Sequence, residues 1–209
     1  MANRVISNEG TSISRTNGRT WALHTQFALL GTKISTDFGG NAAIGGATIR
    51  GARNSIFLRT GLVRSYLITN RTNILIVEAG ANDFATGDRA ADILDVAALV
   101  SYCHMQRAFG FKVIGTTLLP RGTGWPEGAV AVAAFNAARN NLVNPALRAS
   151  VGTQLDGLID WAADPTIGPD SAANDSFYFN ADGLHPTMQG QFQMGNIEAR
   201  VLQNFPADQ

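Results

Sequence analysis

The sequence predicts an α/β fold in which helices cover both faces of a five-stranded parallel sheet. Strand-like segments alternate with segments of helical periodicity along the 209 residues, a pattern typical of parallel sheets with helical crossovers. Residues 73–78 carry a continuous apolar run, as expected of a parallel strand buried on both faces. No linker interrupts the pattern, and we expect a single domain over residues 1–209.

The apolar pattern also gives approximate bounds for each element. Strands are predicted over residues 5–7, 33–38, 73–78, 112–119 and 158–160. Helices are predicted over residues 20–30, about 58–66, 89–109, an alanine-rich stretch ending near 144, and a last segment capped by Thr187. On the third of these helices, Ile93, Ala97, Val100 and His104 are expected near one face, and on the last, Met188, Phe192, Ala199 and Leu202.

Composition narrows the class of partner. Lys and Arg together number 16, as do Asp and Glu, so the formal net charge is zero. Without a basic excess to neutralise phosphates, we expect no nucleic-acid partner. No apolar run is long enough for a signal peptide or a membrane span. We therefore expect no stable membrane insertion, and either a cytoplasmic protein or a domain whose leader or parent protein is not shown; the oligomeric state stays open.

Several residues and motifs that often indicate catalysis or ligand binding are expected to have no such role here. Cys103 is the single cysteine; it lies in an apolar-periodic segment and is expected to be a buried structural thiol. His104 is expected to be an ordinary helix residue. No dinucleotide or P-loop motif is present, and no His, Cys and Asp cluster has metal-ligand spacing. We expect neither a metal nor an organic cofactor.

Polar or glycine-rich stretches follow four of the five predicted strands. They are residues 10–12, 39–48, 80–83 and 182–185. In a parallel α/β sheet, ligands bind outside the carboxyl ends of the strands. The four stretches are therefore predicted to converge at one edge of the sheet and to form a site.

The residue types in these stretches are those of a serine hydrolase. Asp182 lies three residues before His185, so the carboxylate can orient the imidazole while the other ring nitrogen acts as base. Ser12 follows Gly10 and Thr11 at the end of the first strand, where a sharp turn would expose its hydroxyl. Gly46, through its backbone N–H, and Asn82, through its amide, are candidate oxyanion donors.

The ordered set resembles the SGNH hydrolases, the GDSL-type esterase and lipase family. Four blocks carry the resemblance: Gly10-Thr-Ser-Ile-Ser14, Asn41-Ala-Ala-Ile-Gly-Gly-Ala-Thr48, Gly80-Ala-Asn-Asp83 and Asp182-Gly-Leu-His-Pro186. The sequence departs from the family at Thr11, where an Asp usually precedes the serine. The resemblance implies a flavodoxin-like three-layer α/β/α sandwich without a cofactor. It also implies a Ser12, His185 and Asp182 triad, with an oxyanion hole from Ser12, Gly46 and Asn82.

The function implied is hydrolysis of carboxylic esters through an acyl-enzyme, with short acyl or acetyl groups on a small molecule or carbohydrate. Ile44, Phe84 and Trp125 are expected as apolar contacts for the substrate. Two alternatives stay open from the sequence. One is a non-catalytic binding module that has kept the fold, and the other is an acyltransferase that uses the same triad.

Overall fold

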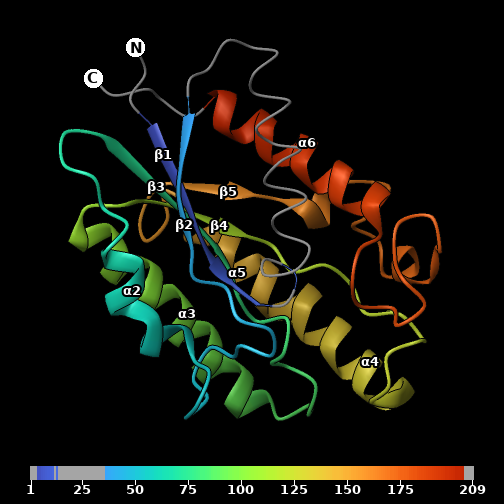
Figure 1. Cartoon of the computed structure of the whole chain (residues 1–209). Coiled ribbons are helices and arrows are strands. Elements are labelled where there is room, and N and C mark those ends of the chain that lie inside the picture. Colours follow the sequence, from blue (N-terminus) through green and yellow to red (C-terminus); the bar gives the residue numbers. More distant parts are fainter. Residues whose placement is uncertain (1–3, 12, 14–35, 205–209) are drawn as a thin grey trace.

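The chain folds around a five-stranded parallel sheet with strand order β2-β1-β3-β4-β5 (Figure 1). The structure is a computed structural model and describes residues 4–11, 13 and 36–204. The strands are β1 (Arg4–Gly10), β2 (Thr36–Asn41), β3 (Thr72–Glu78), β4 (Lys112–Thr116) and β5 (Gly157–Ile159). The predicted α/β class and the five parallel strands are thus confirmed. The helix predicted over 20–30 lies outside the described residues.

Alternation along β3 divides the core into two layers. Leu75 and Val77 belong to one apolar cluster, whereas Ile74 and Ile76 belong to the other. Because successive side chains of a strand point to opposite faces, each cluster fills the space between one face of the sheet and the helices that cover it. This explains why residues 74–77 are all apolar.

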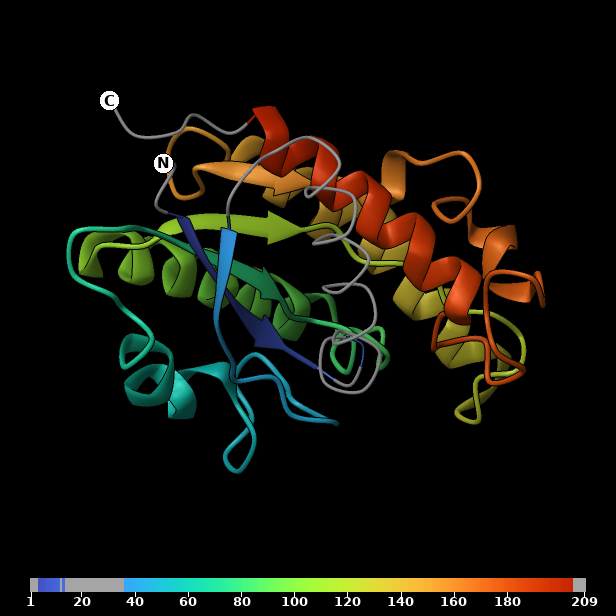
Figure 2. The same cartoon turned by 45° about the horizontal axis from the view of Figure 1, so that its top comes forward.

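The helices that the structure describes are divided unequally between the two faces, as Figure 2 shows. The first cluster packs against η2 (Ile56–Arg59), α2 (Thr60–Arg64), α3 (Arg89–Phe109), α4 (Gly128–Ala138), the π-helical turn η3 (Arg139–Val143) and α5 (Asn144–Ala149). The second packs against α6 (Met188–Asn204) and the short turns η4 (Trp161–Ala163) and η5 (Asp170–Asn174). No helix among the described residues has the length and apolarity that crossing a bilayer requires.

Helix α3 has the bounds that the sequence predicts, because local signals fix both ends. The Asp88 carboxylate accepts the N–H groups of Ala90 and Ala91, at 3.0 and 3.1 Å, and Gly110 ends the helix with φ 117°. The residues that the sequence places near one face do not form the buried face of the helix. Val96, Leu99 and Cys103 are buried, whereas Ile93, Ala97 and His104 are exposed.

Cys103 is a free buried thiol, as predicted.

Helix α6 begins directly after its predicted cap, since Thr187 Oγ1 accepts the Gly190 N–H at 3.3 Å. Its buried face differs in part from the prediction. Ala199 and Leu202 are buried with Met194, but Met188 and Phe192 are 69% and 47% exposed. Met188 and Phe192 thus lie on the outer side of α6, whose inner side in the same turns carries the buried Gly190 and Gln191.

Three strands differ from their predicted bounds by more than one residue. β1, predicted over residues 5–7, spans Arg4–Gly10 and pairs with β3 along that whole length. β2 extends through Gly40 to Asn41, because Ser7 and Asn8 of β1 continue to pair with these residues. Residue 40 is a glycine that packs against the Tyr66 ring, and a Cβ there would come within 2.5 Å of the ring. β4 stops at Thr116 instead of continuing to 119. The next amide that leaves the sheet, that of Leu118, donates to Asn144 Oδ1 at 2.8 Å.

Candidate active site

The structure places most of the predicted site residues in loops that leave the carboxyl ends of the strands. Gly46 and Asn82 follow β2 and β3, and Asp182 and His185 follow β5 by way of η4 and η5. Ser12, the predicted nucleophile, lies outside the described residues. Its neighbours Thr11 and Ile13 are described and are buried, with Thr11 directly after β1.

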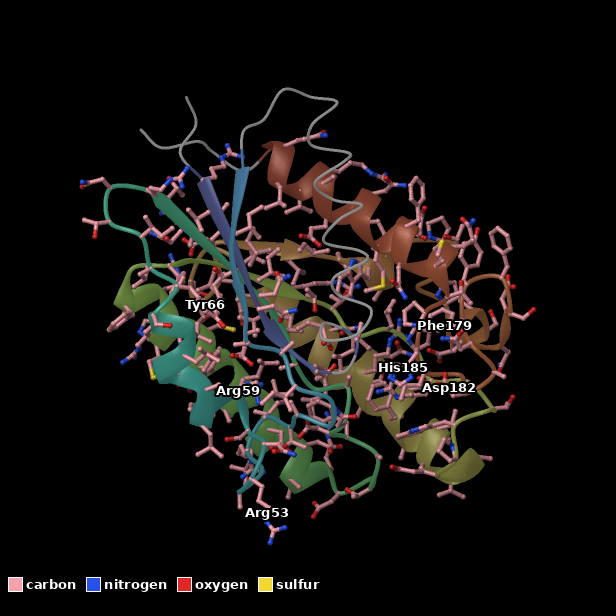
Figure 3. All side chains as sticks on the ribbon, viewed as in Figure 1. Arg53, Arg59, Tyr66, Phe179, Asp182 and His185 are labelled. Carbon is pink, nitrogen blue, oxygen red and sulfur yellow. The ribbon has the colours of Figure 1, made fainter. Side chains whose placement is uncertain are left out.

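Asp182 and His185 form the contact that the sequence predicts. His185 Nδ1 lies 2.7 Å from Asp182 Oδ2, and Figure 3 shows the two side chains adjacent to one another. The other carboxylate oxygen, Oδ1, accepts the backbone N–H groups of Leu184 and His185, both at 2.9 Å. Burial acts to raise the pKa of Asp182, but these hydrogen bonds outweigh it and hold the pKa below its usual value. The carboxylate is therefore ionised and fixed in place at neutral pH.

The loop that carries this pair is closed by backbone hydrogen bonds. The Asn180 N–H donates to the His185 carbonyl at 2.8 Å, and the Gly183 N–H donates to the Asn180 carbonyl at 2.9 Å. Gly183 has φ 60°, a left-handed conformation that costs a glycine little. The turn thus places the Asp182 carboxylate against the imidazole ring of His185, three residues later in the chain.

Asn82 and Asp83 tie the loop after β3 to the loop after β2. Asn82 Nδ2 donates to the Ala47 carbonyl at 2.8 Å. Both carboxylate oxygens of Asp83 accept the Ile49 N–H, at 3.2 and 3.3 Å. Burial raises the pKa of Asp83 to about 7, with the Ile49 hydrogen bond acting in the opposite direction. The two loops that carry the predicted oxyanion donors are therefore held to one another by side chains of the Gly-x-Asn-Asp block.

Gly46 is suited to present its backbone to a ligand. Its φ is 75°, and a Cβ built on it would meet nothing within 4 Å. Among the residues that the structure describes, no hydrogen bond of its N–H is formed. The Asn82 amide has two hydrogens, so its bond to Ala47 leaves a second one to donate.

The three predicted apolar contacts differ in exposure. Ile44 is half-buried. Phe84 and Trp125 are only 4% and 7% exposed and belong to the apolar cluster under α3 and α4. The Trp125 ring packs edge-on against Phe135, with centroids 5.9 Å apart. In this structure both rings therefore pack inside the protein, and only Ile44 has an appreciable exposed surface.

Two buried charged residues, Glu78 and Arg121, were not predicted as part of the site. Glu78 ends β3, and Arg121 is 1% exposed, with its guanidinium 4.3 Å from the Phe135 ring centroid. Arg121 donates to the Ala81 carbonyl, directly before Asn82. Burial lowers the pKa of Arg121 to about 9, although Glu78 and Asp182 act to raise it. Arg121 comes shortly after a strand and directly after Pro120. A charged residue at that position is a signal from which sequence reasoning could have placed Arg121 near the site.

A cavity of about 240 Å³ lies beside the Asp182–His185 loop. It is lined by Thr123, Gly124, Ala173, Asn174, Ser176, Phe179, Asn180, Ala181 and Gly183. A larger cavity, of about 320 Å³, surrounds Arg139 and Arg148 and is lined by none of the candidate site residues. In the described part of the chain, no group of three or more His, Cys, Asp or Glu side chains is placed to hold a metal ion.

An α/β/α sandwich with an Asp–His pair and an Asn-bearing loop beyond its parallel strands has the architecture of an SGNH-type hydrolase. The model of the GDSL-like lipase/acylhydrolase family matches residues 10–191, and the chain therefore belongs to that family of hydrolases. A search of curated proteins found no match.

Several solved structures share the fold of this chain. A GDSL-like lipase from Bacteroides thetaiotaomicron is 20% identical with a TM-score of 0.64, covering 97% of this chain and 86% of its own. The psychrotrophic esterase EstA from Pseudoalteromonas sp. is 17% identical with a TM-score of 0.63, covering 95% and 96%. An acetyl xylan esterase is 15% identical with a TM-score of 0.64, covering 93% and 97%. At these identities the likeness shows the shared fold.

Proposed function

We propose that the protein is a serine esterase that hydrolyses carboxylic esters of short acyl or acetyl groups on a small molecule or carbohydrate. The observation that carries the proposal is the 2.7 Å contact between His185 Nδ1 and Asp182. An ionised carboxylate on Nδ1 places the proton there, so that Nε2 carries the lone pair of a general base. Ser12, in the nucleophile block of the family, is the proposed partner of that base.

The proposed reaction has two halves. In the first, His185 takes the Ser12 proton as the hydroxyl oxygen attacks the ester carbonyl, and the tetrahedral oxyanion is held by the N–H groups of Ser12 and Gly46 and the amide of Asn82. The alcohol leaves with the proton that His185 returns, and the acyl group stays on Ser12. In the second half, water attacks the acyl-enzyme along the same path and releases the acid.

The substrate proposal rests on the surroundings of the Asp182–His185 loop. The adjacent cavity is lined by small Gly and Ala residues, by one aromatic residue, Phe179, and by the polar residues Thr123, Asn174, Ser176 and Asn180. Such a wall suits a polar alcohol portion better than a long alkyl chain. An acetyl ester of a carbohydrate, the kind of ester named for the acetyl xylan esterase of similar fold, fits this description.

Replacing Ser12 by Ala tests the proposal. We expect Ser12→Ala to lose hydrolysis of p-nitrophenyl acetate and labelling by a fluorophosphonate, because both need the hydroxyl as nucleophile. A p-nitrophenyl ester chain-length series beside acetylated oligosaccharides would measure acyl and alcohol preference. Product analysis in the presence of an acceptor alcohol separates hydrolysis from acyl transfer. Labelling that persists in Ser12→Ala would overturn the assignment of the nucleophile.

A further inference from the structure

Thr11 and Glu78 form a buried contact next to the predicted nucleophile. The backbone N–H and the hydroxyl of Thr11 both donate to Glu78 Oε2, at 3.0 and 2.6 Å. Thr11 Oγ1 in turn accepts the Ile13 N–H at 3.3 Å. Residues 11 and 13 flank Ser12, so both of its neighbours are tied, directly or through one hydroxyl, to a carboxylate at the end of β3.

The arrangement uses the hydrogen-bonding capacity of both side chains. A hydroxyl has one hydrogen to donate and two lone pairs, so Thr11 can bond Glu78 and still accept from Ile13. One carboxylate oxygen of Glu78 accepts both Thr11 hydrogens, and hydrogen bonds of this kind are stronger when the acceptor is charged. Thr11 and Glu78 are 0% and 2% exposed, and in such surroundings these bonds are not shared with bulk water.

Burial of a carboxylate costs less with a positive charge in its neighbourhood, and Glu78 interacts electrostatically with Arg121, whose pKa it acts to raise. Glu78, Arg121 and Ile13 line one small cavity, and Arg121 Nε and Nη1 have no hydrogen-bond partner among the described residues. Arg121 also donates to the Ala81 carbonyl. Arg121 thus joins the surroundings of Glu78 to the loop that carries Asn82.

We propose that Glu78 is a positioning residue for the reaction, acting through Thr11 to fix the backbone on both sides of Ser12. The proposal rests on the proposed function, in which Ser12 is the nucleophile. Nucleophilic attack requires the reacting atoms within about 3.5 Å, and a misplacement of about 1 Å can cost roughly a hundredfold in rate. Here the position where the family usually has Asp carries a hydroxyl, and the carboxylate that this hydroxyl contacts comes from β3.

The test measures turnover per labelled active site in two Thr11 variants. Thr11→Val keeps the shape and the backbone N–H, which can still donate to Glu78, but it loses the two bonds of the hydroxyl, to Glu78 and to Ile13. Thr11→Ser keeps all of these bonds. We expect kcat, counted per site titrated with a fluorophosphonate, to fall by about tenfold to a hundredfold in Thr11→Val, with KM changed less than about twofold. Thr11→Ser should retain most of the wild-type kcat. Glu78→Gln, which keeps an oxygen but loses the charge, should fall at least as far as Thr11→Val.

Thr117→Val is the matched control. Thr117 is also a fully buried threonine and lines the same cavity, but its hydroxyl bonds Asp160 and the Ala162 N–H instead of the nucleophile segment. A purely structural role for Thr11 would lower the thermal midpoint and the fraction of titratable sites, as in Thr117→Val, and leave kcat per site unchanged. An unchanged kcat per site in both Thr11→Val and Glu78→Gln would overturn the positioning role. If Ser12→Ala stays active, the proposed function itself fails, so the two failures are distinguishable.

Discussion

Asn82 shows at the scale of one residue how the site is prepared before substrate arrives. One amide hydrogen is bonded to the Ala47 carbonyl at 2.8 Å, which fixes the plane of the amide and therefore the direction of the second hydrogen. Asp83, its neighbour, bonds the same loop at Ile49. Donors that are oriented in advance stabilise an oxyanion without a reorganisation cost during the reaction. In the proposed mechanism, Asn82 of the Gly-x-Asn-Asp block would donate to the oxyanion, while Asp83 holds the neighbouring loop.

We predict that Asn82→Ala lowers kcat for a short ester by about a hundredfold to a thousandfold, because it removes an oxyanion donor. KM should change little, since the oxyanion forms only in the transition state. The measurement is steady-state hydrolysis of p-nitrophenyl acetate. Asn140→Ala is the control, because Asn140 also bonds through its amide, to Asp170, but lies outside the site. A kcat within about twofold of wild type in Asn82→Ala would exclude this role for Asn82.

At the scale of elements, glycines let the loop after β4 pack directly against the loop that carries Asp182. The Gly122 N–H donates to the Gly183 carbonyl at 2.8 Å. A Cβ on Gly124 would lie 1.9 Å from the Ala181 carbonyl oxygen, and a Cβ on Gly183 would lie 2.9 Å from the backbone of Gly122. The position of the Asp–His pair therefore depends on backbone-to-backbone contact between these two loops.

We predict that Gly124→Ala lowers activity more than stability. The added methyl group must displace the Ala181 carbonyl, directly before Asp182, and the displacement should reduce kcat by about tenfold or more. The control is Gly61→Ala in α2, where a Cβ meets nothing within 4 Å; helix propensity should there add up to about 1 kcal/mol of stability. The measurement pairs kcat with urea unfolding. Equal effects of the two substitutions on kcat would contradict the loop-contact argument.

At the scale of the whole molecule, the sequence predicted the features that depend on residues close to one another along the chain, such as helix ends and the burial of a strand. Asp88 and Gly110 give α3 its bounds, and the apolar run of β3 predicts its burial on both faces. The contact between Thr11 and Glu78 depends on β1 lying beside β3 in the sheet. The apolar periodicity of the sequence does not predict which strands are neighbours. Burial of Phe84 likewise follows from close packing against Gly80, a tertiary contact.

The order of the four blocks predicted the Asp182–His185 pair, because both residues lie on one short turn. It did not predict Arg121, whose partners come from other elements.

The stability of the whole fold should depend on pH through Asp83. Its pKa rises from 3.8 to about 7 on folding, chiefly because burial disfavours the charged form. Between about pH 4 and pH 7 the folded protein therefore holds a proton that the unfolded chain has released, so stability falls as the pH rises through this window, by at most about 1.4 kcal/mol per pH unit from this group. Asp83→Asn cannot ionise and should lack this contribution.

The measurement is the free energy of unfolding in urea for wild type and Asp83→Asn at several pH values between about 4.5 and 7.5. Subtracting one curve from the other removes the contributions of the groups that both proteins share. Asp182 is one of them: because its pKa is lowered on folding, its contribution to stability is present at pH values above its unfolded pKa and is lost only at lower pH. We expect wild type to lose stability relative to Asp83→Asn as the pH rises. Parallel curves would mean that Asp83 is already ionised at pH 4.5, held so by its bonds to Ile49. In that case the oxyanion loops would be tied by a charged carboxylate, and Asp83→Asn would weaken the tie equally at every pH tested.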